Sequence, residues 1–165
     1  MRFTYKQIAS EHAERWQALR LEGARDFPLG FLVTVEETAA TSIDRCREIL
    51  DAGAIRGVFH ADELVGFCGY RPQRLERTRH GAEIGPFFVA GAYQGSGAAR
   101  TLIRGVMNEA RENGVEQLEL FVDTKNDRAI AFYERQGFKR IAVHPDSVRI
   151  DGISRDAYFY RLVMK

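Results

Sequence analysis

The stretch Tyr93-Gln94-Gly95-Ser96-Gly97-Ala98-Ala99-Arg100 decides the fold of this chain. It follows an apolar run typical of a strand, at residues 82–89, and leads into an amphipathic pattern with helical spacing, at residues 97–113. A turn that delivers a strand into a helix brings unpaired backbone N–H groups together, and the helix dipole adds partial positive charge there. Because Gly95 and Gly97 carry no Cβ, a phosphate group can approach this backbone closely. The stretch therefore predicts a turn that binds phosphate or pyrophosphate.

Two common phosphate-binding motifs are missing from the sequence. It contains no G-x-x-x-x-G-K-[ST], and no G-x-G-x-x-G follows a first strand, which argues against a P-loop and against a dinucleotide-binding fold. The pattern Gln94-x-x-Gly97-x-Ala99 instead resembles the coenzyme A signature of the GCN5-related N-acetyltransferases, the GNAT family, in which Gln or Arg, Gly, and Gly or Ala recur at this spacing.

A second motif in the right order strengthens this resemblance. After the strand-like residues 118–122, the chain reads Asn126-Asp127-Arg128-Ala129-Ile130-Ala131-Phe132-Tyr133-Glu134-Arg135-Gln136-Gly137-Phe138. This is similar to the closing motif of the same family, with an Asn, an Ala three residues on, a Tyr four residues later, and then Gly-Phe. The resemblance in motifs covers residues 80–138, and elsewhere it lies in the order of elements.

The whole chain, residues 1–165, is expected to form a single N-acetyltransferase domain. Periodicity and turn signals predict strands at about residues 2–8, 55–60, 64–70, 82–89, 117–123, 139–144 and 156–164, and helices at about 11–25, 42–53, 97–113 and 127–136. The residues Thr41-Ser42-Ile43-Asp44 are interpreted as a capping box that starts the second helix. The resemblance implies an α/β fold with a central twisted mixed sheet and helices on both faces.

Pro86 interrupts the strand at residues 82–89 because it has no N–H to donate. A bulge or a loss of pairing is therefore expected at this point. In the resembled family the matching strand bulges and splays from the next one, and the gap holds the pantetheine arm of coenzyme A. The resemblance thus implies that pantetheine pairs with the backbone of Phe87, Phe88 and Val89.

The resemblance also implies acetyl-CoA as the acyl donor. Its implied binding residues are Gln94, Gly95, Ser96, Gly97, Ala98, Ala99, Arg100 and Asn126. Asn126 also stands at a helix N-cap position, which alone would explain it. Arg100 and Arg128 either reach the coenzyme phosphates or are solvated helix residues.

Two residues are candidates for catalysis. Tyr133 matches the general acid of the family, and a tyrosine stays protonated at neutral pH, so it can donate a proton to a departing thiolate. The alternative is that Tyr133 packs as a core aromatic residue. Glu83 could accept the proton of the amine, directly or through a water molecule, or it could simply face solvent at the start of a strand. Histidine is by its chemical type a better base than a carboxylate, but His80 adjoins an arginine-rich loop, which favours a surface position.

The acceptor site is expected to involve Phe27, Phe31 and Tyr158. Phe27 and Phe31 lie in an apolar loop that in the resembled family walls the acceptor site, and Tyr158 lies on the last strand. Packing in the core explains the loop residues equally well. The arginines at 71, 74, 77 and 79 indicate a solvated loop or, as a lesser alternative, recognition of an acid-bearing substrate.

Composition narrows the remaining choices. Twenty-four Lys and Arg residues against 23 Asp and Glu residues leave a formal net charge of +1, so no bulk field recruits nucleic acid or an anionic membrane. No apolar run is long enough to span a membrane, and no residue spacing indicates a metal site. Cys46 and Cys68 are interpreted as buried, reduced thiols of a cytoplasmic protein. A homodimer is compatible with the sequence.

The sequence therefore predicts an acetyl-CoA-dependent N-acetyltransferase that acts on a small-molecule or peptide amine by direct transfer in a ternary complex. Neither cysteine matches a nucleophile position in the motifs. The alternative is a non-catalytic acyl-CoA-binding module, against which Tyr133 argues, since a pure binder needs no acid there. The acceptor amine cannot be read from the sequence, because one scaffold serves many acceptors.

Overall fold

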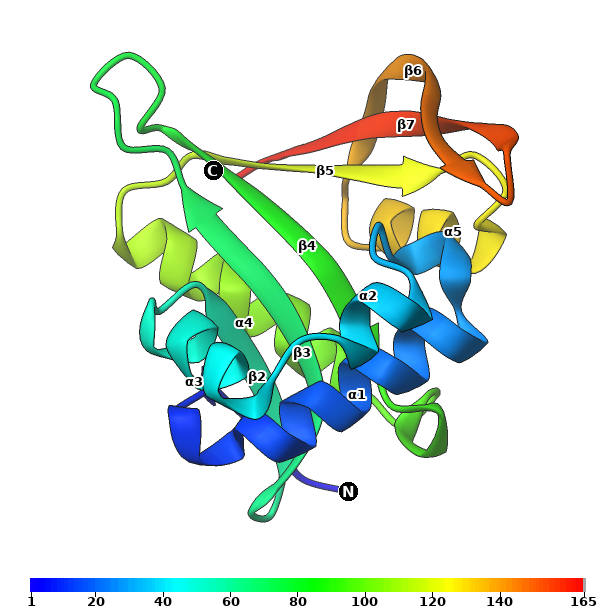
Figure 1. Cartoon of the computed structure of the whole chain (residues 1–165). Helices are drawn as coiled ribbons and strands as arrows, with labels where there is room; N and C mark the ends of the chain where they lie inside the picture. Colours follow the sequence, from blue (N-terminus) through cyan, green and yellow to red (C-terminus); the bar gives the residue numbers. More distant parts are fainter. Residues whose placement is uncertain (165) are drawn as a thin grey trace.

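Seven strands form a twisted sheet in the computed structural model, which describes residues 1–164 (Figure 1). The strands are β1 Phe3–Gln7, β2 Ile55–His60, β3 Glu63–Pro72, β4 Gly81–Val89, β5 Gln117–Asp123, β6 Lys139–Ile150 and β7 Ile153–Val163. Their order across the sheet is β1-β2-β3-β4-β5-β7-β6. All neighbours are antiparallel except β4 and β5, which are parallel.

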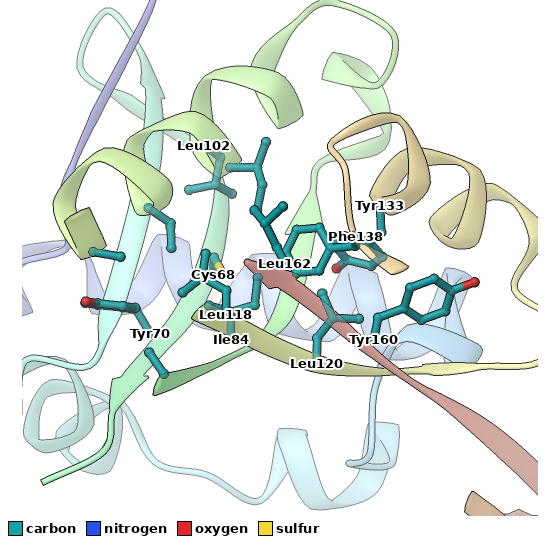
Figure 2. Close-up of a cluster of buried hydrophobic side chains, with 14 of the residues drawn as sticks. Cys68, Tyr70, Ile84, Leu102, Leu118, Leu120, Tyr133, Phe138, Tyr160 and Leu162 are labelled. Atoms are coloured by element: carbon teal, nitrogen blue, oxygen red, sulfur yellow. The ribbon is translucent and has the colours of Figure 1, made fainter. Parts of the chain in front are cut away.

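Helices cover both faces of this sheet. They are α1 Ala13–Asp26, α2 Val35–Ala39, α3 Ile43–Asp51, α4 Ala98–Glu112 and α5 Asp127–Arg135. Trp16 and Leu19 of α1 and Leu50 of α3 pack with Phe59 and Phe67 on one face. On the other face, α4 and α5 bury a larger cluster that includes Leu102, Leu118, Tyr133, Phe138 and Tyr160 (Figure 2). The predicted fold class is confirmed.

Helices α2 and α3 begin at side-chain caps. The hydroxyl of Ser42 accepts the Arg45 N–H at 3.0 Å, so α3 starts where the sequence predicts, although by a single cap rather than a box. The reciprocal capping box is formed by Thr34 and Glu37 instead, and it starts α2. The sequence analysis missed this short helix and placed the box at the wrong helix.

Strand β4 bulges at Pro86, as predicted. Cys68 of β3 pairs with Phe87, whereas Tyr70 pairs with Ile84, so the register shifts between these pairs. Gly69 makes the bulge possible, because a Cβ at this residue would lie 2.2 Å from the Gly85 carbonyl oxygen. The bulge therefore depends on residues of both strands.

Strands β4 and β5 pair over a short distance and then diverge, as Figure 1 shows. The pairs join residues 81–83 with residues 117–119, and beyond Glu83 no further β4–β5 pair forms within residues 1–164. The expected splay is thus confirmed. It leaves the backbone of β4 open on the side that faces β5.

The β6–β7 hairpin is longer than the sequence predicts. Pairing is interrupted between His144 and Val148, where Asp146 adopts a positive φ of 48°, and then resumes to Ile150. The Asp156 carboxylate accepts the Asp146 N–H at 2.8 Å and holds this irregular segment. The sequence analysis ended this strand at about residue 144, whereas pairing resumes beyond the bulge.

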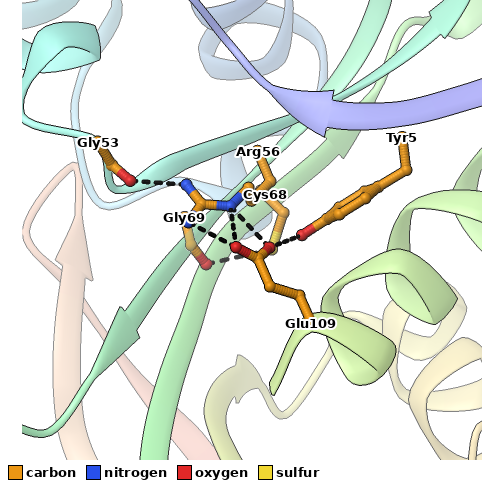
Figure 3. A network of polar contacts seen from close by, with 6 residues as sticks. All are labelled: Tyr5, Gly53, Arg56, Cys68, Gly69 and Glu109. Atoms are coloured by element: carbon orange, nitrogen blue, oxygen red, sulfur yellow. Dashed lines mark hydrogen bonds and ion pairs between the residues drawn. The ribbon is translucent and has the colours of Figure 1, made fainter. Parts of the chain in front are cut away.

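A partly buried ion pair fastens α4 to the N-terminal strands (Figure 3). The Arg56 guanidinium of β2 donates to both carboxylate oxygens of Glu109 at 2.8 and 2.9 Å, and to the Gly53 carbonyl at 2.6 Å. The Tyr5 hydroxyl donates to the same carboxylate. The helix that starts at the glycine turn is therefore anchored near its other end.

Candidate active site

The turn before α4 presents unpaired N–H groups to open space. Gly95 and Gly97 have positive φ values of 77° and 98°, and a Cβ built on either would meet no atom within 4 Å. Within residues 1–164, the N–H groups of Gly95, Gly97, Ala99 and Arg100 have no hydrogen-bond partner. This arrangement suits an anion such as a pyrophosphate.

Gln94 joins this turn to its surroundings. Its amide nitrogen donates to the Val89 carbonyl at 3.0 Å, and its amide oxygen accepts a hydrogen bond from Arg128 of α5. The two sequence motifs therefore meet through one side chain. Arg128 is held by this contact, whereas Arg100 is exposed beside the unpaired N–H groups.

A cavity of about 450 Å³ begins at the splay of the two parallel strands. Its floor comes from the β4 bulge and from β5, and residues 28–33 close one side. Ser147, Val148 and Ile150 of the β6–β7 hairpin close another, because the bulge at Asp146 redirects this segment. Most of the lining is apolar. Such a cavity is typical of a small-molecule site.

Tyr133 of α5 lies at the wall of this cavity. Its side chain is 8% exposed and packs against Phe87 and Phe138, with ring centroids 6.1 and 5.5 Å away. Its hydroxyl has no hydrogen-bond partner within residues 1–164. Burial raises the pKa of Tyr133 above its ordinary value, so the hydroxyl stays protonated at neutral pH. A proton donor is thus available at the splay.

Glu83 lines the same cavity from β4. Its carboxylate lies 3.3 Å from the guanidinium of Arg71, which also donates to the Gly85 carbonyl at the bulge. Glu83 is half exposed, so solvent reaches its carboxylate. His80 precedes β4 in an exposed turn and is not among the residues that line the cavity.

The model of the acetyltransferase (GNAT) family matches residues 9–138, which is most of the chain. The chain belongs to this family.

Individual GNAT relatives support this assignment. The N-alpha-acetyltransferase RimI of Mycobacterium tuberculosis is 40% identical over 99 residues, covering 59% of this chain and 58% of that protein. A mycothiol acetyltransferase of Propionibacterium freudenreichii is 32% identical over 140 residues, covering 76% of this chain and 45% of that protein. The chain spans about half the length of these curated relatives. The structure of yncA from Salmonella typhimurium, solved with its cofactor acetyl-CoA, superposes with a TM-score of 0.84 at 16% identity, covering 100% of this chain and 95% of the other.

Asn126, the first residue of the closing GNAT motif, caps α5 and also lines the cavity. Its side-chain oxygen accepts the Ala129 N–H at 3.3 Å. The amide nitrogen has no partner within residues 1–164 and remains able to donate. Both roles considered from the sequence are therefore compatible in one side chain.

The residues expected at the acceptor site divide into two groups. Phe31 lines the cavity and is also buried against Phe67 and Phe88. Phe27 packs on Phe88 with ring centroids 5.5 Å apart and is not among the lining residues. Phe27 therefore belongs to the core side of its loop, which favours the packing alternative for this residue.

Tyr158, the third residue expected at the acceptor site, is not among the residues that line the cavity. It packs against the cluster that includes Tyr133, and its direct partner on β5, Val122, does line the cavity. The Tyr158 ring lies under the guanidinium of Arg140, 4.1 Å from the ring centroid, and beside Tyr160. The β7 residues that line the cavity are Asp156 and Ala157.

Sequence reasoning missed a buried ion pair at the cavity. Arg155 of β7 donates to both oxygens of Asp123 at 2.6 and 2.9 Å. Burial alone would raise the pKa of Asp123, but the hydrogen bonds from Arg155 and from the Lys125 N–H outweigh it and lower this pKa. The pair fixes the turn that leads to Asn126. The sequence signal that could have revealed this ion pair is an Asp that ends a strand shortly before a helix.

The cysteines take no part in the cavity. Cys46 and Cys68 are free and buried, and burial raises the pKa of Cys68 to about 12, so its thiol is a poor nucleophile. Among residues 1–164, no group of three or more His, Cys, Asp or Glu side chains is placed to hold a metal ion. In the same part of the chain, no helix has the length and apolar character needed to cross a membrane.

Proposed function

We propose that this protein transfers the acetyl group of acetyl-CoA to a primary amine, by direct transfer in a ternary complex. The observation that carries the proposal is the set of four unpaired N–H groups at the start of α4, beside a splay that leads to Tyr133. A pyrophosphate at the turn and an extended arm along the open edge of β4 would bring a thioester toward this tyrosine. Membership of the GNAT family, and the binding of acetyl-CoA by the structurally similar yncA, support this placement of the donor.

The residues of the chain fit the binding of the donor. The turn offers open space and N–H donors, because Gly95 and Gly97 lack side chains. The free β4 edge at Phe87, Phe88 and Val89 offers backbone partners to the pantetheine amides. The Asn126 amide nitrogen adds a donor on the other side of the splay.

The proposed chemistry needs one acid and a weak base. The amine nitrogen forms a bond to the thioester carbon, and the carbon–sulfur bond breaks. The departing thiolate takes the proton of the Tyr133 hydroxyl, and the tyrosinate is reprotonated from solvent. The amine proton passes to Glu83 or to a water molecule. His80 is disfavoured as the base because it lies outside the cavity lining.

An α-amine is the better acceptor on intrinsic grounds. At about pH 7.5, roughly 40% of an α-amine with a pKa near 7.7 is neutral, against roughly 0.1% of a lysine side chain. A partly exposed carboxylate such as Glu83 then suffices as a base. The name of the relative RimI, N-alpha-acetyltransferase, also favours an α-amine as the acceptor. Since buried free thiols are typical of reducing compartments, we place this activity in the cytoplasm.

The experiment that tests the proposal replaces Tyr133 by Phe. Loss of a positioned acid should lower kcat and kcat/KM together, by about 10²-fold or more, because the interaction forms mainly in the transition state. The affinity for acetyl-CoA should stay unchanged in calorimetric titration. Tyr158→Phe is the matched control, since Tyr158 is not among the residues that line the cavity, and it should keep full activity.

Two results would contradict the proposal. Full activity of Tyr133→Phe would show that solvent protonates the thiolate. Tight binding of acetyl-CoA without thiol release on any amine of a broad panel would indicate an acyl-CoA-binding module instead.

A further inference from the structure

Arg71 and Glu83 form a cross-strand ion pair at the rim of the cavity. They are direct partners in the β3–β4 register, and both line the cavity. The Gly85 carbonyl at the bulge accepts from Arg71 at 2.6 Å and fixes the guanidinium beside the point where β4 and β5 part. One positive and one negative group therefore lie side by side where an acceptor has to enter.

Arg71 has unused hydrogen-bonding capacity. A guanidinium carries five N–H donors, and within residues 1–164 Arg71 uses one for Gly85 and one for Glu83. The remaining donors can hold a carboxylate in a two-point contact. Glu83 likewise contributes only one oxygen, at the long distance of 3.3 Å. This pair can open toward a ligand at little cost, because it is half exposed.

Most other charged groups near this rim already have partners. Asp123 is held by Arg155, and Asp156 accepts from the Asp146 N–H. Glu119, the β5 neighbour of Glu83, is bound by Arg161 at 2.9 Å. Arg20, the other cation of the cavity lining, stacks on Trp16 and donates to Gln17. Arg71 and Glu83 are thus the adjacent opposite charges with capacity to spare.

The rest of the cavity is apolar on the acceptor side. Its lining there includes Phe31, Leu32, Val33, Val148 and Ile150. Leu32, which also lines the cavity, is 83% exposed. An apolar group of several carbons is the complement of this surface.

We infer that the acceptor is a free α-amino acid with an apolar side chain. Its carboxylate would bind Arg71, its amine would lie at Glu83, and its side chain would occupy the apolar part of the cavity. An adjacent Arg–Glu pair complements the adjacent opposite charges of a zwitterion, whereas a peptide N-terminus has no carboxylate next to its amine. Acetylation removes the charge on the amine, so the product loses its contact with Glu83. This inference rests on the proposed function and names its substrate class.

The test compares acceptors that differ only in the carboxylate. Leucine, methionine and phenylalanine are each assayed against their own amides by thiol release at saturating acetyl-CoA, with rates expressed per neutral amine. We expect kcat/KM for the free acid to exceed that for its amide by about 10-fold or more, as for a charge-assisted two-point contact. The difference should lie mainly in KM, since this contact exists before and during transfer.

Arg71→Gln identifies the group responsible. It should lower kcat/KM for the free acid by about 10-fold or more and leave that for the amide nearly unchanged. Loss of a purely structural tie to Gly85 would instead lower both rates equally and weaken acetyl-CoA binding. Arg71→Lys, which keeps the charge, should restore part of the preference. Arg74→Gln, in the exposed loop after β3, is the matched control and should change neither rate.

The outcomes separate this inference from the proposed function. Equal turnover of acids and amides would overturn the inference and leave the acetyltransferase activity standing, with a peptide terminus or a plain amine as acceptor. A preference for the acid that survives in Arg71→Gln would also overturn it. Absence of transfer to every amine by a protein that binds acetyl-CoA would refute the proposed function itself.

Discussion

Gly97 combines a positive φ with open space, as Gly95 and Gly114 also do. Its φ of 98° is strained for any residue with a side chain, and the space in front of its Cα is open. What distinguishes the turn at Gly97 is its place at the start of α4, beside unpaired N–H groups that suit an anion. The sequence motif identified the residue, and the structure supplies the reason.

We predict that Gly97→Val weakens acetyl-CoA binding by about 10-fold or more, because the branched side chain would occupy the place of the pyrophosphate and hinder at least one charge-assisted hydrogen bond. The strained backbone should also cost about 1–2 kcal/mol of stability, which leaves the domain folded. Calorimetric titration and a thermal melt measure the two effects.

Gly114→Val is the matched control for this strain. Gly114 follows the other end of α4, has a φ of 77° and also has no atom within 4 Å of a built Cβ. The two variants should lose similar stability, but only Gly97→Val should lose affinity. Equal affinity in both would remove the assignment of the turn to phosphate.

Individual residues were predictable from the sequence where a motif or a local rule applied. The motifs single out Gly97, Asn126 and Tyr133, and the structure places Gly97 at the start of α4 and the other two at the cavity. Tyr158 was expected at the acceptor site but is not among the lining residues, because which β7 side chains reach the cavity depends on the register of β7 with β5. No local pattern in the sequence sets that register.

At the scale of elements, α4 is held at both ends by different means. Its start carries the glycine turn, and its last turns carry Glu109, whose carboxylate binds Arg56 and Tyr5. Burial alone would raise the pKa of Glu109, but the hydrogen bonds from these two partners lower it below the ordinary value. A pKa lowered by folding means that the ionised carboxylate stabilises the folded state.

We predict that Glu109→Gln lowers the free energy of unfolding by about 1.5–3 kcal/mol near pH 7, as expected when a hydrogen bond to a charged group is weakened. Because the folded pKa is lowered, this stabilisation is present above the ordinary value of 4.5 and is lost as the pH falls through the folded pKa. The stabilities of wild type and variant should therefore converge in acid. Urea unfolding at several pH values between about 3 and about 7 measures the stabilities of wild type and variant.

Glu112→Gln, one turn-length further along the exposed end of α4, is the control and should unfold like the wild type at every pH. A constant gap between Glu109→Gln and wild type down to the acid limit would mean that the side chain acts through packing. Acetyl-CoA affinity of the folded variant should be unchanged, since the turn lies at the other end of the helix.

Elements with long periodic patterns were predicted well, and short ones were not. Helix α2 has too few residues for a period and is defined by its Thr34–Glu37 box. The second half of β6 follows a bulge at Pro145 and Asp146. Because these residue types favour turns in general, the sequence there resembles the end of a strand. Of these two segments, only the second half of β6 lines the cavity, through Ser147, Val148 and Ile150.

On the scale of the whole molecule, order and motifs predicted the fold. The alternation of strands and helices and the Pro86 bulge in β4 are confirmed. Of the proposed acceptor side, only Phe31 and Glu83 were named from the sequence, and Arg71 only as a lesser alternative, because residues 28–33, 71, 83, 147, 148 and 150 meet only after the sheet has formed. Its chemistry arises from contacts between segments distant in sequence.

The divergence of β4 from β5 has a consequence for amide hydrogen exchange. Amides on the β5-facing edge of residues 84–89 have no strand partner, so they should exchange quickly with deuterated water although they lie in the middle of a sheet. Acetyl-CoA should slow their exchange, because the pantetheine arm would take up these groups. The amides of β2, paired on both sides, serve as an internal reference and should change little. Exchange that stays fast at residues 87–89 in the complex would place the arm elsewhere.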